Sequence, residues 1–408
     1  LQQASKNKFL KNYNVTSPLA ENNTTLNSYF NFNANREDLS IKSSIEIFEN
    51  LNTERSSDRY EFVYPQFEIN KNLNTFESFD GDVILSSNFY QKKYNTNVYE
   101  GALINDLRFN SNTNFLNSGF LNNFKILLKN VNTNTSNSNK YKDSHNTQVL
   151  SAMQYQTSYP LAKSTNTSNN SLTPIASVMF SPNKTKNMKN DDKRINTDNI
   201  FSLERIADVE TVEGGLSFTL GSNYKKTTKE DKEIVSLNLA QVFRIENNDD
   251  LPLSSTIGQK SSDINGKLKL IPNKYLNINY DFSLNSNLDE FNYNLVKSEV
   301  ILNKLVTTFE FLKEDNVIGD KSYFSYKADY NINKSGTISV SSRKNKKTDL
   351  TEFYNMVYAY KNDCLVASVG YDKKFYNDIN LKPEKNLFFT ITIKPFGKVT
   401  SPSLTNLK

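Results

Sequence analysis

The sequence predicts an all-β protein, a large antiparallel transmembrane β-barrel. Apolar and polar residues alternate in short segments from Thr25 to Lys394, so the two faces of each predicted strand differ. Hydrophobic residues make up only 37% of the chain, and the mean hydropathy is -0.63, yet 27 Phe and 22 Tyr are spread along it. The longest apolar runs, such as Ile126–Leu128, are far shorter than the roughly 20 residues that a membrane-spanning helix needs. A barrel with a wet interior fits these observations, because only every second residue must be apolar.

The clearest predicted strand covers Leu276–Leu284, where apolar residues alternate with Asn, Asp and Ser. Such runs are about nine to eleven residues long, the length of a tilted membrane-spanning strand. Turn residues separate them, as at Asp80–Gly81, Asn265–Gly266 and Lys334–Gly336. One strand and its connection take roughly 20 residues, so we expect roughly 18 to 20 strands in this chain. The same alternation recurs in five further segments: Leu216–Leu220, Ile264–Leu270, Phe291–Leu295, Phe324–Ile332 and Tyr354–Tyr360.

Polar connections of very different length favour a membrane barrel over a soluble β-sandwich or β-helix, which alternation by itself does not exclude. Two long loops are predicted, over Asn130–Gln148 and over the basic stretch Pro182–Thr197. Tyr residues near strand ends, including Tyr275, Tyr360 and Tyr371, are typical of an aromatic girdle. No short sequence repeat stands out, which disfavours a propeller or a solenoid.

Residues for catalysis or metal binding are scarce. The only histidine, His145, lies in a predicted loop, whereas a hydrolase needs a base held by packed neighbours. One histidine and one cysteine cannot assemble a metal cluster of nitrogen and sulfur ligands. Acidic pairs such as Asp191–Asp192 and Asp249–Asp250 have Lys or Asn beside them, which is typical of a solvated surface. We therefore expect no enzymatic activity, no cofactor and no metal, and the mixed net charge of +5 does not indicate a nucleic-acid partner.

The single cysteine, Cys364, begins a predicted apolar strand that ends at Tyr371. One interpretation is a small buried or lipid-facing residue. The other is a disulfide bond to a cysteine outside these residues, which an oxidising periplasm would permit.

A block of residues resembles the hallmark of the LptD family of lipopolysaccharide-assembly proteins. Asp198–Asp208, followed by Glu213–Leu216, carries the likeness, and Leu172–Ala176 is similar to the strand that leads into the hallmark. The likeness extends over most of the chain from about Glu61 and is strongest after Leu172. The matching residues of the block are Leu203, Glu204, Arg205, Ile206, Ala207, Gly214 and Gly215. Segments similar to the family's last strands are Tyr358–Cys364, Val369–Tyr371 and Leu387–Ile393 with Phe396–Gly397.

The resemblance implies a protein of the bacterial outer membrane that inserts lipopolysaccharide into the outer leaflet. The lipid would leave through a lateral gate between the first and last barrel strands. The implied partners are lipopolysaccharide, a plug lipoprotein like LptE, a periplasmic jellyroll bridge like LptA, and the lipids of the outer membrane. Because nothing here matches the family's N-terminal jellyroll or opening strands, we expect residues 1–397 to be the C-terminal part of a larger barrel, and 398–408 to be a tail.

The resemblance also makes the segment Leu387–Lys394 one wall of the lateral gate. Pro395 cannot donate to a β-ladder and so limits this last strand to about eight residues. The family carries an adjacent cysteine pair near Cys364, bridged to the N-terminal domain, so a single cysteine leaves at most one such bridge. The expected outward set is Leu387, Phe389, Ile391 and Ile393, and the expected inward set is Phe388, Thr390, Thr392 and Lys394.

Three other functions are compatible with alternating strands. The main alternative is a generic outer-membrane porin or ligand transporter, which would show the same pattern. An outer-membrane hydrolase is disfavoured by the single histidine. A soluble β-rich adhesin would have to fold without detergent.

Overall fold

The structure is a computed structural model in which almost every regular element is a strand. It describes residues 20–22, 25–53, 58–73, 80–95, 97–116, 118–315, 321–375, 384–393, 397–400 and 404–405. Within these residues, the only helix is a single 3-10 turn, η1 (Leu253–Ser255). No helix of the described part is long and apolar enough to cross a membrane. The prediction of an all-β protein is confirmed.

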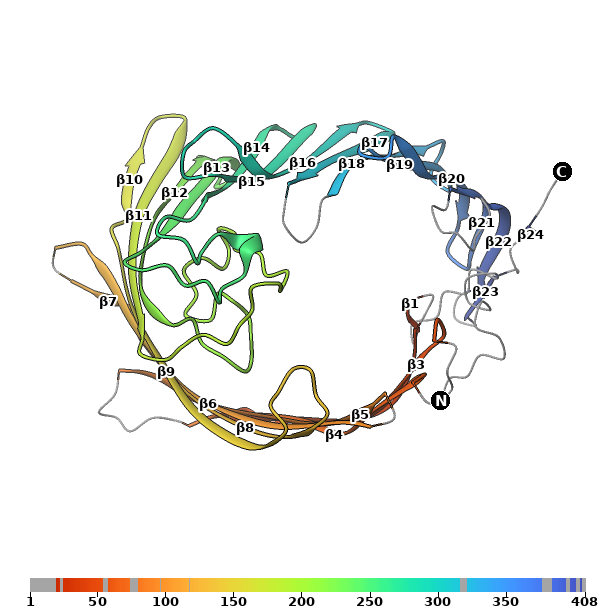
Figure 1. Cartoon of the computed structure of the whole chain (residues 1–408). Coiled ribbons are helices and arrows are strands. Elements are labelled where there is room, and N and C mark those ends of the chain that lie inside the picture. The colour runs from red at the N-terminus through yellow and green to blue at the C-terminus, as the bar shows by residue number, and fades with distance from the viewer. Residues whose placement is uncertain are drawn as a thin grey trace. The chain divides into compact units, whose positions relative to one another are not determined.

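The chain divides into two compact units. Unit 1 comprises residues 1–157, 177–188 and 202–218. Its strands pair antiparallel with their neighbours in the sequence, from β1 to β6, and β8 then pairs with both β6 and β7 (Figure 1). Its strands are β1 (Ala20–Asn22), β2 (Thr25–Asn35), β3 (Leu39–Asn50), β4 (Tyr60–Asn72), β5 (Gly81–Tyr94), β6 (Val98–Ser111), β7 (Asn114–Phe115), β8 (Leu121–Ser136) and nearly all of β9 (Ser144–Ser158).

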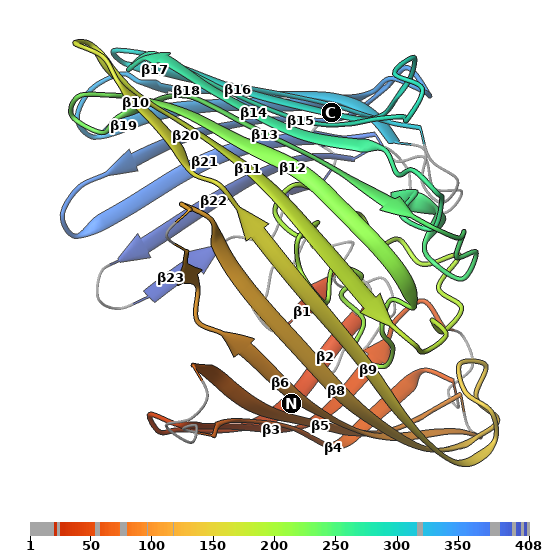
Figure 2. The same ribbon diagram turned by 90° about the vertical axis from the view of Figure 1, so that its left-hand side faces the viewer.

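Unit 2 comprises residues 158–176, 189–201 and 219–408, and two long strands, β11 (Ser168–Ser181) and β12 (Gly215–Thr228), have residues in both units. From β13 to β22 each strand pairs antiparallel with the next, and these neighbouring strands lie side by side in Figure 2. The remaining strands are β10 (Leu161–Ser164), β13 (Glu233–Arg244), β14 (Ile264–Asn273), β15 (Leu276–Leu284), β16 (Phe291–Leu302), β17 (Leu305–Glu314), β18 (Lys321–Asn331), β19 (Gly336–Asn345), β20 (Leu350–Lys361), β21 (Leu365–Lys374), β22 (Glu384–Ile393), β23 (Gly397–Thr400) and β24 (Leu404–Thr405).

The strands of unit 2 have one polar and one apolar face, as the alternation predicts. On one face, Lys297, Glu310 and Ser325 occupy paired positions on β16, β17 and β18. The other face exposes large apolar side chains to the surroundings, which is typical of contact with a non-aqueous phase. These exposed residues include Phe309, Phe324, Tyr354, Met356, Tyr358, Val369 and Phe389.

In unit 1 the buried core lies on the face of the sheet opposite to Leu107 and Leu128, which are exposed. Ala102, Ile104, Leu127, Val131, Leu150 and Ala152 from β6, β8 and β9 form this core together with Val212. Val212 belongs to the 182–214 loop, which joins β11 to β12. The loop therefore packs on the sheet instead of extending into solvent.

The long strands agree with the prediction in number, but many are longer than expected. Nineteen of the described strands have nine or more residues, which lies within the predicted range, and the others have two to four. Strands reach 14 to 16 residues in unit 1, longer than predicted, with β8 the longest. Alternation is lost where both faces of a strand carry polar side chains, as over Asn132, Thr133, Asn134 and Thr135 of β8, although the ladder continues there.

Two predicted local structures are wrong. The Asn130–Gln148 stretch is not one long loop, because β8 continues to Ser136 and β9 begins at Ser144. Asn265–Gly266 is not a turn and lies inside β14. Gly266 is needed there for space, since a Cβ on it would lie 2.1 Å from the ring of its cross-strand partner Phe282. The expected tail after residue 397 contains the short strands β23 and β24.

Candidate functional site: a buried loop, a polar pocket and the last strand

The 182–214 loop, whose parts 182–188 and 202–214 belong to unit 1, is closed on itself by a buried ion pair. Arg205 Nε and Nη2 donate to Glu213 Oε2 and Oε1 at 2.7 and 2.6 Å, and Nη2 also donates to Ser217 Oγ at 2.9 Å. Both charged side chains are only 1% exposed. A bidentate guanidinium–carboxylate pair fixes both distance and orientation, so residues 205 and 213 stay together at the start of β12.

The other residues of the predicted family block support the same loop. Ile206 is buried, and Leu203 packs against the core. Gly214 allows close packing, because a Cβ there would lie 2.2 Å from the carbonyl oxygen of Asn183. Ala207 and Gly215 have positive φ angles of 48° and 87°, where the backbone turns. The block therefore stabilises the conformation of the loop.

Charged side chains of the sheet bind the loop. Arg108 on β6 donates through Nε and Nη2 to both carboxylate oxygens of Glu204, each at 2.7 Å. On β8, Lys129 Nζ pairs with Asp106 and also donates to the carbonyl oxygen of Val209 at 2.9 Å. Burial raises the pKa of Glu204, but the hydrogen bonds and charge of Arg108 outweigh burial and lower it. Glu204 is therefore ionised and holds the loop on the sheet.

Glu210 lies at the centre of a second cluster in the same unit. Lys140 Nζ and Lys186 Nζ contact its two carboxylate oxygens at 2.6 and 2.8 Å, and the hydroxyls of Tyr90 and Tyr141 donate to it. Burial raises the pKa of Glu210, but the hydrogen bonds from the lysines and Tyr141 outweigh burial and lower it to about 2. Sequence reasoning missed this cluster, because its members are up to 120 residues apart and form no local motif.

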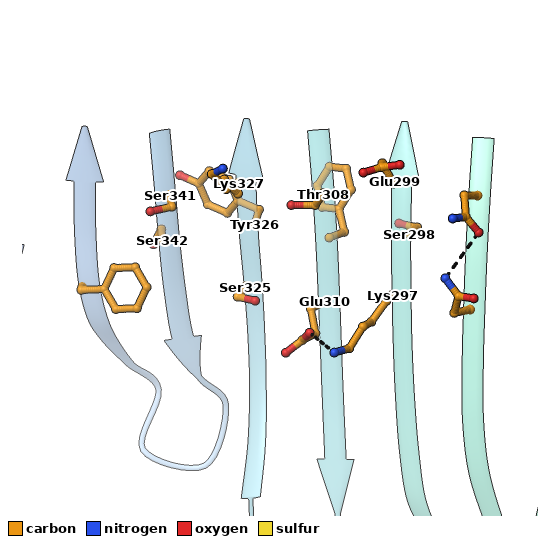
Figure 3. A pocket seen from close by; sticks show the side chains of 14 residues that line it. Lys297, Ser298, Glu299, Thr308, Glu310, Ser325, Tyr326, Lys327, Ser341 and Ser342 are labelled. Atoms are coloured by element: carbon orange, nitrogen blue, oxygen red, sulfur yellow. Dashed lines mark hydrogen bonds and ion pairs between the residues drawn. The ribbon is translucent and has the colours of Figure 1, made fainter. Parts of the chain in front are cut away.

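A polar pocket of about 370 Å³ lies on β15 to β20 of unit 2 (Figure 3). Lys297 Nζ contacts Glu310 Oε2 at 2.9 Å, and Tyr323 OH donates to Glu310 Oε1 at 2.7 Å. Lys327 and Phe353 also line the pocket, together with Ser and Thr hydroxyls and the amides of two Asn residues. Hydroxyls, amides and paired charges supply many donors and acceptors, and a lysine ammonium is a common partner of phosphate. This set can form many hydrogen bonds to a polar, hydroxylated ligand.

A second pocket of about 610 Å³ lies on β16 to β20 and is lined by Tyr323 and Arg343, which contact Glu310 and Phe353 of the first pocket. Arg194, in the unit 2 part of the loop, pairs with Glu314, and its guanidinium carbon lies 4.1 Å from the centre of the Tyr293 ring. The polar face of unit 2 therefore carries charged groups along much of its length.

The predicted gate strand lies within β22, which begins earlier, at Glu384, and ends at Ile393. Lys394 lies outside the described residues. Of the expected outward set, Phe389, Ile391 and Ile393 are 42 to 48% exposed, whereas Leu387 is intermediate. Phe388, Thr390 and Thr392, of the inward set, are also intermediate. The ladder pairs Thr390 with Ser368 and Phe388 with Gly370 on β21, and these two residues pair in turn with Ala359 and Val357 on β20. Phe353, further along the same face of β20, lines the polar pocket.

Both edges of β22 are paired. One edge meets β21. Along the other edge, β23 pairs Thr390–Ile393 with Gly397–Thr400, and β24 pairs Asn386 and Leu387 with Thr405 and Leu404. The C-terminal segment thus runs back along the last long strand.

Cys364 and His145 are both exposed. Cys364 is a free thiol in the turn before β21, and its backbone N–H donates to the Asn362 side chain at 3.0 Å. His145 lies in β9 instead of in a loop, and its Nε2 is 3.3 Å from Thr147 Oγ1. Within the described residues, no group of three or more His, Cys, Asp or Glu is arranged to hold a metal ion.

A family model described as LptD, LPS transport system D, matches residues 1–300. A comparison with curated proteins finds no match. Among solved structures, the chain is similar to a mutant ferric enterobactin receptor from Pseudomonas aeruginosa, with 9% identity, a TM-score of 0.43, and coverage of 91% of this chain and 70% of that one. The siderophore receptor PirA from Acinetobacter baumannii is 7% identical, with a TM-score of 0.43, and the match covers 91% of this chain and 71% of that one. A mutant Rhodopseudomonas blastica porin is 11% identical, with a TM-score of 0.27, and the match covers 76% of this chain and 92% of that one.

Proposed function

Because the chain belongs to the LptD family, we propose that β22 forms one wall of a lateral exit through which lipopolysaccharide enters the outer leaflet. Membership makes the chain an outer-membrane β-barrel protein of lipopolysaccharide transport, a family of transporters and not of enzymes. The exit and the role of β22 are our own assignments. Transport through such an exit requires no covalent reaction, only a path with one polar and one apolar side for an amphipathic lipid.

The two faces of β22 carry the proposal. Phe389, Ile391 and Ile393 are exposed on the apolar face, whereas Thr390 and Thr392 lie on the face that the polar pocket shares. A lipopolysaccharide has acyl chains beside a phosphorylated sugar head. We assign the sugar head to the polar face with Lys297 and Glu310, and the acyl chains to the apolar face.

Cysteine labelling tests which face of β22 meets water. Cys364 is the only cysteine, so Cys364→Ser gives a clean background for single cysteines at Thr390, Thr392, Phe389 and Ile391. We expect a membrane-impermeant maleimide to label the first two positions and to spare the last two. Labelling of Phe389→Cys and Ile391→Cys alone would overturn the orientation.

A depletion experiment tests the transport role. Depletion of the protein in its own cell should lower the amount of lipopolysaccharide at the cell surface. A bulky maleimide on Thr390→Cys should have the same effect, and Lys232→Cys in an exposed turn is the control. If depletion leaves surface lipopolysaccharide unchanged and instead removes solute permeability, the protein is a porin or ligand transporter.

Three further assignments rest on the family. We infer that a plug lipoprotein like LptE and a periplasmic bridge like LptA bind the whole protein, and co-purification from detergent extracts tests both.

The exposed thiol of Cys364 is available for one disulfide bond. Since the sequence has no other cysteine, that bond would reach a cysteine outside it. A shift in electrophoretic mobility on reduction supports the bond, and the same mobility with and without reductant contradicts it.

A further inference from the structure

The hairpin between β6 and β8 has an exposed apolar tip. Phe115, Leu116 and Phe120 are 69%, 50% and 41% exposed. The tip is a defined turn, since Leu116 N donates to Phe120 O at 2.9 Å and Gly119 N to Leu116 O at 2.8 Å. Gly119 has a φ of 89°, which favours glycine. Leu116 and Phe120 therefore lie opposite each other in a hydrogen-bonded turn, and the exposed ring of Phe115 lies next to them in the sequence, at the end of β7.

The hairpin leaves the plane of the sheet. The pairing of β6 with β8 ends at Asn110 and Lys125, and β8 then pairs through Leu121 and Asn122 with the short strand β7. Figure 1 shows the β7 hairpin projecting outward from the neighbouring strands of unit 1. The apolar tip thus lies beyond the ladder and cannot belong to the core of unit 1.

The composition of this hairpin differs from that of other short turns in the chain. No charged residue occurs between Arg108 and Lys125. Many other turns carry at least one charge, as expected where a turn faces water. Among the uncharged connections, Asn95–Asn97 and Thr165–Thr167 contain only Asn and Thr, and Tyr159–Pro160 contains a single ring. The charged turns include Arg36–Asp38, Lys229–Lys232, Lys274–Tyr275, Asn303–Lys304, Ile332–Ser335 and Lys346–Asp349.

The tip continues the apolar surface of the strands. Phe124 and Leu128 of β8 are 37% and 46% exposed on the face that also exposes Leu107 of β6. Tyr155 is 47% exposed, and its hydroxyl donates to Asn122 Oδ1 of β8 at 2.7 Å. A tyrosine with an apolar ring and a bonded hydroxyl is typical of the boundary between lipid and water.

We propose that the hairpin, described at residues 112–116 and 118–120, inserts Phe115, Leu116 and Phe120 into the interfacial region of the lipid bilayer and anchors this part of the sheet there. The interface suits it better than the hydrocarbon centre, because the hairpin carries polar amides and Asn112 donates to the carboxylate of Asp80 at its base, a charge that is costly to bury in hydrocarbon. The rings of Phe115 and Phe120 then leave water. This proposal depends on the outer-membrane location and not on the lateral exit.

Tryptophan fluorescence tests the proposal, because the chain contains no tryptophan. Phe115→Trp and Phe120→Trp are each introduced into the full chain, which is reconstituted in phosphatidylcholine vesicles with bromine near the head group or deep in the acyl chains. Leu128→Trp, on the apolar face of β8, is the control for lipid contact and for correct insertion. Glu37→Trp, in an exposed charged turn, is the control for water.

We expect shallow bromine to quench the fluorescence of the Phe115→Trp and Phe120→Trp variants at least twofold more than that of the Glu37→Trp control. Aqueous iodide should quench the two hairpin variants less than it quenches that control. Deep bromine should quench the Leu128→Trp variant more strongly than the two hairpin variants. Iodide quenching equal to that of Glu37→Trp, without bromine quenching, would overturn the proposal. Shielding from both quenchers would overturn it as well, because the tip would then contact protein instead of lipid.

Discussion

Lys129 and Asp106 form an enclosed ion pair that joins two strands of the sheet and the buried loop. Lys129 Nζ lies 2.8 and 2.9 Å from the two carboxylate oxygens of Asp106 and donates its third hydrogen bond to Val209 O. Arg108 Nη2 adds a contact of 2.6 Å to Asp106. The side chains of Lys129 and Asp106 are 0% and 2% exposed. All three donors of the ammonium group are therefore used within the protein.

Lys129→Met should destabilise the folded protein by roughly 3 kcal/mol, because a buried carboxylate loses one of its two cationic partners. Urea unfolding in detergent micelles measures the change. Adding Asp106→Leu should restore part of the loss, since it removes the uncompensated charge. Lys232→Met, at an exposed pair, should leave stability unchanged. If Lys129→Met is as stable as the wild type, the pair does not hold the loop to the sheet.

Glu210 should make stability depend on pH in acid. Its pKa in the folded protein is about 2, below its ordinary value of 4.5. A depressed pKa means that the ionised form stabilises the fold, fully above pH 4.5 and progressively less as the pH falls toward 2. The free energy of unfolding of the wild type minus that of Glu210→Gln should therefore be constant near neutral pH and shrink between these values. A constant difference across that window would contradict the lowered pKa.

Gly370 and Phe388 should behave as a coupled pair. A Cβ at Gly370 would lie 2.1 Å from the Phe388 ring, so Gly370→Ala must displace the ring from β21 and should cost about 1 to 3 kcal/mol. Phe388→Leu removes the far end of the ring and should make Gly370→Ala nearly harmless. A double-mutant cycle measured by urea unfolding gives the coupling energy. Strictly additive effects would show that the ring does not cover the glycine.

The pairing of β22 with β23 can be trapped by a disulfide bond. Ile391 and Val399 are register partners. Antiparallel partners have Cα atoms about 4.5 to 5.5 Å apart, within the range that a disulfide spans. In a Cys364→Ser background, Ile391→Cys with Val399→Cys should oxidise readily, whereas Phe389→Cys with Val399→Cys should not. If β22 is the exit wall, the trapped protein should also deliver less lipopolysaccharide, and reductant should restore delivery.

The sequence is most informative where one face of a strand is apolar and the other polar. The predicted strand Leu276–Leu284 has the bounds of β15, because its alternation is unbroken. The ends of β8 and β9 escape prediction because polar residues occupy both faces there, so no periodic signal distinguishes strand from loop. Gly266 resembles a turn residue in the sequence because the ring that requires the glycine, Phe282, lies on another strand.

The candidate site is predictable only in part. The family block is recognisable from its residues, and the structure gives their physical role in the buried loop. Arg108 and Glu204 are 96 residues apart, and nothing local to either one indicates the partner. The polar pocket escapes prediction for the same reason, because its lining comes from six strands that become neighbours only through sheet pairing.

The edge of β22 that β23 and β24 cover is also protected from pairing with strands of other chains. An open strand edge presents unpaired N–H and C=O groups, which can template the addition of a foreign strand and lead to aggregation. Here residues 397–400 and 404–405 use those groups themselves. In the folded chain this edge of β22 is therefore not open to a foreign strand, and another strand can pair with it only by displacing β23 and β24.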